Sequence, residues 1–169
     1  MFSWLRTRRE PRKPATFRPS LEALGERINP THPHFVSATS AVTGGGALVV
    51  NFKEAGLGDN QRVNVTLSGD AHAVYQWFNH GGNNPQGVPF NVDTTFSLSG
   101  TFTSDKNGNV TGTFTYNPPS VSEFLSTHHS AGWVPSLSVS YTNVVVTDTT
   151  NGVSTAKFNL DQPVVHFTV

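Results

Sequence analysis

The sequence contains no cysteine among its 169 residues, so neither disulfide bonds nor thiolate metal sites are available. Charged residues make up 13% of the chain, roughly half the usual share, and the formal net charge is zero. This balance gives no reason to expect a nucleic-acid partner. No apolar run reaches the length of a membrane-spanning helix or of a signal-peptide core. A domain of about 135 residues can nevertheless be stable without crosslinks, so the lack of cysteine does not indicate the cytoplasm.

The clearest pattern in the chain is an alternation of apolar and hydroxyl residues over residues 95–116. A period of two predicts half-buried strands, and the Asp-Lys-Asn-Gly segment between the two arms predicts a turn. We therefore predict an antiparallel hairpin in which Phe102 lies opposite Val110. Gly100 and Gly112 would also face each other and leave a notch for an aromatic ring from a facing sheet.

The rest of the body also reads as β-strands separated by turns. Odd-numbered apolar positions over 63–77 predict one long strand, or two coaxial strands with a bend at Gly69-Asp70. Three successive valines from Val144 predict a strand that is either bulged or covered on both faces. Pro163 is expected to open a last strand at a sheet edge. Two polar loops are predicted, at 79–93 and at 117–135, and the second contains one helical turn near 121–125. Other strands are predicted at 36–42, 47–52, 137–146 and 156–160.

These patterns predict an all-β domain over residues 35–169. The expected architecture is an antiparallel β-sandwich, immunoglobulin-like or related, with a closed barrel as the alternative. Residues 1–34 are expected to form a disordered basic arm. Residues 1–27 hold seven arginines and lysines against three glutamates, whereas the remainder holds four against eight acids. The arm is expected to contain one short amphipathic helix, which Ser20 can cap and Asn29-Pro30 would end.

The segment RPSLEALGERINP within this arm resembles the planctomycete-type N-terminal motif, of general form R-P-x-L-E-x-L-E-x-R-x-x-P. Gly25 stands where that motif usually has an acid. The resemblance implies export or surface association, an extracellular or cell-surface location and a contact of the arm with export machinery. The alternative is a basic arm that binds nucleic acid or anionic lipid. The matching residues are Arg18, Pro19, Leu21, Glu22, Leu24, Glu26, Arg27 and Pro30.

The body is similar, in three short phrases, to uncharacterised secreted bacterial β-proteins. The phrases are FKEAGLG, NHGGNNPQG and SYTNVVVTDTTNG. This resemblance implies secretion and brings no activity or functional residue with it.

Histidines are the first candidates for a binding site. Asp70 and His72 would project from one face of a strand, which is a spacing suited to joint metal ligation. His80 lies in the first polar loop, and His128 and His129 lie in the second, so imidazoles would converge if both loops gather at one end of the sandwich. The alternative is that these histidines are solvated loop residues.

A carbohydrate site is the second candidate. Trp133, in the second loop, offers a ring for stacking, and Asn83, Asn84 and Gln86 in the loop 79–87 offer hydrogen-bonding groups. Such a site would bind cell-surface polysaccharide. The alternative is that Trp133 plugs the end of the sandwich.

Catalysis and calcium binding find less support in the sequence. No G-x-S-x-G elbow is present, and Glu54, Asp93 and Glu123, the acids available for a glycosidase pair, are expected to be surface charges. The aspartate-led segments 105–109 and 148–151 are short of carboxylates for calcium and are expected to be turns. We therefore expect a non-catalytic protein without a cofactor. Its role would be structural or adhesive, with surface polysaccharide or other surface proteins as partners.

Overall fold

The computed structural model describes residues 32–79, 85–119, 122–127 and 132–166. The targeting motif at residues 18–30 lies outside these ranges, as do His80, Asn83, Asn84, His128 and His129.

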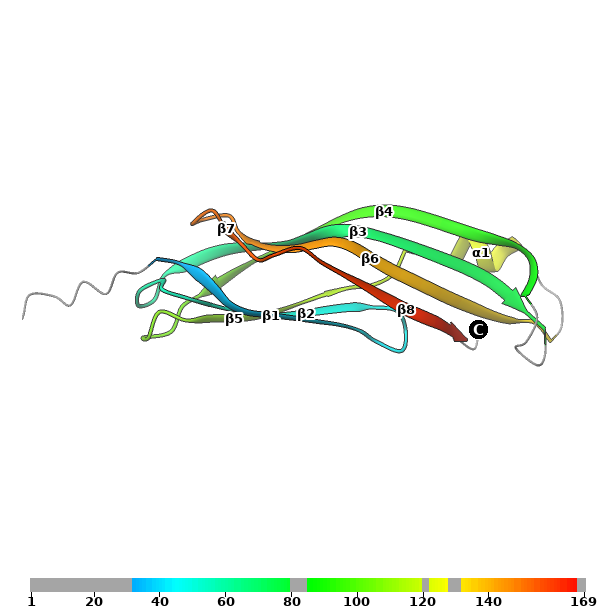
Figure 1. Cartoon of the computed structure of the whole chain (residues 1–169), viewed down its shortest axis with the longest axis horizontal. Helices are drawn as coiled ribbons and strands as arrows, with labels where there is room; N and C mark the ends of the chain where they lie inside the picture. Colours follow the sequence, from blue (N-terminus) through cyan, green and yellow to red (C-terminus); the bar gives the residue numbers. More distant parts are fainter. Residues whose placement is uncertain (1–31, 80–84, 120–121, 128–131, 167–169) are drawn as a thin grey trace, which may run out of the picture.

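The described chain folds into two antiparallel sheets that pack face to face (Figure 1). The three-stranded sheet has the order β1 (His34–Val42), β2 (Leu48–Ala55) and β5 (Val110–Tyr116). In the other sheet, β4 (Pro85–Thr103) is followed by β3 (Arg62–Phe78) and β6 (Val134–Asp148). The far edge of β6 pairs with β7 (Val153–Ser154) and β8 (Phe158–His166). The fold is thus the predicted all-β sandwich.

The core lies between the sheets and follows the period of two in the sequence. In β3 the odd-numbered apolar residues face inward, as expected from the pattern at 63–77, and the strand is continuous over its whole length. In β2 the inward face is even-numbered. The buried residues that make up most of this core are Leu48, Val50, Phe52, Val63, Val65, Leu67, Tyr75, Val139, Tyr141, Val144 and Val146.

The strand that contains the triple valine is bulged, as one of the two expectations had it, and the bulge lies just before the valines. It changes which residues of β6 face inward. Before the bulge the buried positions are odd-numbered, as at Tyr141, and after it they are even-numbered, as at Val144 and Val146. The pairing with β8 shifts between Tyr141 and Val144, and Asn143 has a φ of 54°. The extra residue therefore turns every later even-numbered side chain of β6 into the core.

The predicted hairpin at 95–116 is wrong, because its two arms belong to opposite sheets. In the structure β4 pairs with β3, so that Phe102 lies opposite Val63. The second arm, β5, pairs with β2. The turn itself is confirmed, with Gly108 at a φ of 73°, and it carries the chain from one sheet to the other. Because the two arms lie in sheets that face each other, each arm can bury its apolar side against the opposite sheet.

The predicted notch for an aromatic ring does exist, at Gly112. A Cβ atom on this residue would lie 2.5 Å from ring atoms of Phe52 and Phe102, and Phe102 comes from the facing sheet. These two rings meet edge to face with their centroids 5.1 Å apart. Glycine is therefore required at this position for space.

Two predicted boundaries are wrong. The first polar loop ends before Pro85 rather than at Asp93, because β4 begins there, and Gln86 is a strand residue opposite Trp77. Pro163 lies inside β8 instead of opening a strand of its own. It sits where the pairing with β6 shifts, and β8 pairs only with β6 among the described strands. A bulge on an edge strand tolerates the missing N–H, which explains the position.

A short helix covers the part of the larger sheet that extends beyond the smaller one (Figure 1). This helix, α1 (Ser122–Thr127), confirms the helical turn expected near 121–125. Its Phe124 is buried, and its ring centroid lies 5.0 Å from that of Trp77 and 5.6 Å from that of Tyr75. Trp77, 8% exposed, is therefore a core residue.

Candidate functional site

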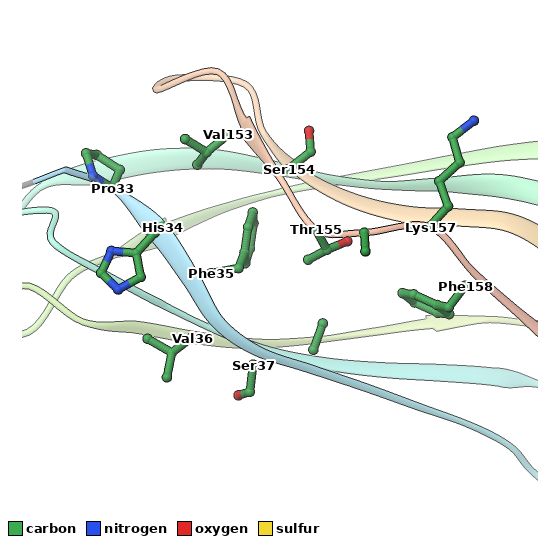
Figure 2. A pocket seen from close by; sticks show the side chains of 12 residues that line it. Pro33, His34, Phe35, Val36, Ser37, Val153, Ser154, Thr155, Lys157 and Phe158 are labelled. Carbon is green, nitrogen blue, oxygen red and sulfur yellow. The ribbon is translucent and has the colours of Figure 1, made fainter.

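A groove runs along one side of the sandwich, between β1 of the smaller sheet and β7 and β8 of the larger one (Figure 2). On the opposite side of the sandwich, residues 104–109 connect β4 of the larger sheet to β5 of the smaller one. We call the open side the edge groove. Its volume is about 610 Å³, and it is lined by Pro33, His34, Phe35, Val36, Ser37 and Ala38 from one sheet and Val153, Ser154, Thr155, Ala156, Lys157 and Phe158 from the other.

Both walls of the edge groove are edges of sheets. Among the described strands, β1 pairs only with β2, and its pairing shifts between Phe35 and Ser37, so that Val36 is bulged and 53% exposed. Phe35 is half-buried and points from β1 toward the segment at Thr155 (Figure 2). Lys157 points away from the groove in the same view. The groove therefore offers half-buried aromatic surface beside an open strand edge.

The outer face of the larger sheet carries the first two candidate metal ligands. Asp70 and His72 do share a face, and both line a shallow depression of about 330 Å³ together with Asp93. Each has its own partner, however. His72 Nδ1 lies 2.5 Å from Asp93 Oδ1, and Asp70 Oδ2 accepts a hydrogen bond of 2.8 Å from the side chain of Asn143.

The described residues do not bring a histidine metal centre together. Within them, no group of three or more His, Cys, Asp or Glu side chains is arranged to hold a metal ion. His80, His128 and His129 lie outside the described ranges, so the predicted convergence of loop histidines stays a prediction.

The carbohydrate candidates are only partly described. Trp133 is half-buried and packs against the core rather than standing free. Gln86 belongs to β4, and Asn83 and Asn84 lie outside the described ranges. The combination of Trp133 with these amides therefore also stays a prediction.

The residue that sequence reasoning missed is Glu54, which is fully buried rather than a surface charge. It continues the even-numbered inward face of β2 after Val50 and Phe52, and this parity was a usable signal. Neither of its carboxyl oxygens has a hydrogen-bonding donor. Burial, and then the nearby carboxyl of Asp148, raise the pKa of Glu54 to about 8.

Asp148 is also fully buried, but its oxygens have donors. Its Oδ1 accepts hydrogen bonds from the backbone N–H groups of Thr150 at 2.7 Å and Asn151 at 3.2 Å, and its Oδ2 accepts one from the Asn151 side chain. The segment at 148–151 is thus the predicted turn. The inward position of Asp148 was not predicted, because the bulge at Asn143 changes which residues of β6 face the core.

The second predicted turn is confirmed at Asp105, which is exposed. Its Oδ1 accepts hydrogen bonds from the backbone N–H groups of Asn107 at 2.8 Å and Asn109 at 2.9 Å. These bonds, above all the one from Asn109, lower the pKa of Asp105. The two aspartates thus hold similar turns, one in solvent and one in the core.

No protein-family model matches the sequence, and no curated protein matches it. The described helix is too short to cross a membrane. The fold and its open side define the class of protein: a cysteine-free all-β sandwich with a groove between two sheet edges.

Proposed function

We propose that the chain is an exported or surface-associated, non-catalytic sandwich protein with an adhesive or structural role. The observation that carries this proposal is the edge groove, a depression between two sheet edges. An adhesive protein needs a surface that selects a partner without chemistry, and such an edge is one of the established ways to bind an extended chain.

The mode of binding that suits this groove is the addition of a strand from a partner protein to β1. Backbone hydrogen bonds to the open edge supply affinity, and side chains that enter beside Phe35 and Phe158 supply selectivity. The low charge of the walls, where Lys157 points outward, favours an uncharged or apolar strand.

We also propose that the sandwich is of the immunoglobulin-like kind. If β1, β2 and β5 are taken as strands A, B and E, and β3, β6 and β8 as C, F and G, their pairings follow the orders of that fold. Support for export comes from the motif at residues 18–30 and from the basic character of the arm that contains it.

Binding in the groove can be tested with two matched valines. Val36 is one of the β1 residues that line the groove and is 53% exposed, with its side chain on the outer side of that edge (Figure 2), and Val88 on β4 is 89% exposed on the far edge. The full chain, Val36→Lys and Val88→Lys are immobilised and probed with a set of short strand-forming peptides and with a glycan array. Peptide binding that is lost in Val36→Lys and kept in Val88→Lys supports strand addition.

Other outcomes have equally clear meanings. Glycan binding that both variants keep would replace protein adhesion by recognition of a surface sugar. If no probe binds, the adhesive role fails. Location is tested separately, by fractionating the native cells that express the chain or its Leu21→Asp, Leu24→Asp variant. Cytoplasmic retention of the unmodified chain would contradict export.

A further inference from the structure

Two buried carboxyl groups, those of Glu54 and Asp148, lie close together inside the sandwich at one end. Glu54 lies near the end of β2 and Asp148 is the last residue of β6, so the two come from opposite sheets. Both have exposed fractions of 0%. Their strand neighbours are hydrophobic: Glu54 lies opposite Val110, and Asp148 lies opposite Val65 and Val153.

The bulge in β6 is what brings the second carboxyl into this place. Because Asn143 inserts one residue, the inward series after it runs through Val144 and Val146 to Asp148. Without the bulge the side chain of Asp148 would point to solvent, where the carboxylate would lose no hydration free energy. The fold instead places it in the core beside Glu54.

The oxygens of Glu54 are the feature that needs an explanation. Both oxygens of Glu54 are buried and accept no hydrogen bond, which is costly whenever this carboxyl carries its negative charge. A proton shared with Asp148 would satisfy one of them and leave the second without a partner. A cation bound by both oxygens at once would satisfy the pair.

We propose that Glu54 and Asp148 are ligands of a buried calcium site that joins the two sheets of the sandwich. The donor set indicates the metal, since the two ligands are carboxylates and the chain has no thiol. Two carboxylates also balance the charge of one divalent cation, so that no net charge is buried.

Further oxygen ligands are available in the turn that follows Asp148. Each carboxylate oxygen has two lone pairs, so Asp148 can bind a cation while its turn N–H bonds remain. The side chain of Asn151 already contacts Asp148 Oδ2, and rotation of its amide presents a carbonyl oxygen. Calcium takes six to eight oxygens, so oxygens other than these three side chains would have to complete its coordination.

The site is tested on the full chain in buffer freed of metal by a chelator and then dialysed. Thermal unfolding is followed at a fixed pH of about 7.5 with CaCl₂ from zero to about 10 mM, and with MgCl₂ as the comparison. Titration calorimetry gives the dissociation constant. The expected result is a melting temperature that rises with the calcium concentration, and less so with magnesium, which requires a stricter geometry.

Glu54→Gln and Asp148→Asn keep the shape of each side chain and the acceptor for the turn, but each removes one ligand charge. Both should weaken calcium binding at least tenfold. Asp105→Asn is the matched control, because Asp105 holds a similar turn in solvent, and it should keep the full calcium response.

Three results would overturn the proposal. The first is a wild-type protein whose melting temperature ignores calcium. The second is an equal calcium response in Glu54→Gln. The third is loss of the response in Asp105→Asn alone, which would move the site to the exposed turn.

Discussion

Glu54 should make the metal-free fold less stable as the pH rises. Its pKa is about 8 in the folded protein, against an ordinary value of 4.5, because the carboxyl is buried next to Asp148. Between these values the folded state holds a proton that the unfolded state has released. The stabilisation that the Glu54 carboxyl contributes is therefore fully present below pH 4.5, declines between pH 4.5 and pH 8, and is lost above pH 8.

The size of the effect follows from the width of the window. Each pH unit within it changes the free energy of unfolding by about 1.4 kcal/mol, so the whole window corresponds to an upper limit of about 5 kcal/mol. Any water that reaches the pair as it ionises lowers this figure. Even half of it is a large part of the stability of a small domain.

Glu54→Gln isolates this contribution, because its amide donates to Asp148 at every pH. Urea unfolding of wild type and variant should be compared at about pH 5, 6, 7 and 8, with chelator present throughout. The variant should match the wild type near pH 5 and become progressively more stable than it toward pH 8. Parallel curves for the two proteins would refute the reasoning, since Glu54 would then ionise alike in both states.

Three other changes test the packing and the turns. Tyr141→Phe removes a hydrogen bond to the carbonyl oxygen of Gly46 and should lower the free energy of unfolding by about 1–3 kcal/mol in urea melts. Gly112→Ala places a methyl group 2.5 Å from two rings and should cost about 1–3 kcal/mol, whereas Gly44→Ala, with no atom within 4 Å, should melt like wild type. Wild type should lose stability as the pH falls below 3.8 through the lowered pKa of Asp105, and Asp105→Asn should lack that part of the acid loss in pH-dependent melts.

The sequence was informative about which side chains face inward and less so about which strands are neighbours. The parity of β3 and β2 predicted the buried faces, because a strand has only two faces and one must be apolar. The same alternation is expected whether two strands are hydrogen-bonded neighbours in one sheet or lie in two sheets that face each other. Residues 95–116 were therefore predicted to form one hairpin, although its two arms belong to different sheets. In the structure β4 pairs with β3 and β5 pairs with β2, so the partner of each arm lies outside residues 95–116.

The candidate site shows the same limit. Glu54 was visible in the alternation of β2, but Asp148 faces the core only because one residue is inserted at Asn143. A bulge can be predicted from the broken alternation of three valines, yet the sequence does not say at which residue the phase changes. The meeting of two carboxyls from strands about 90 residues apart therefore required the structure.

The arrangement of the first and last described strands has a mechanical consequence. In Figure 1 the start of β1 and the end of β8 lie toward opposite ends of the long axis. A force that pulls these two points apart acts along the strands and loads the β1–β2 and β6–β8 hydrogen bonds in shear, many at a time. Strands loaded in this way separate together rather than by unzipping one bond after another. A chain anchored at one end and pulled at the other would therefore resist the load with two complete strand pairs.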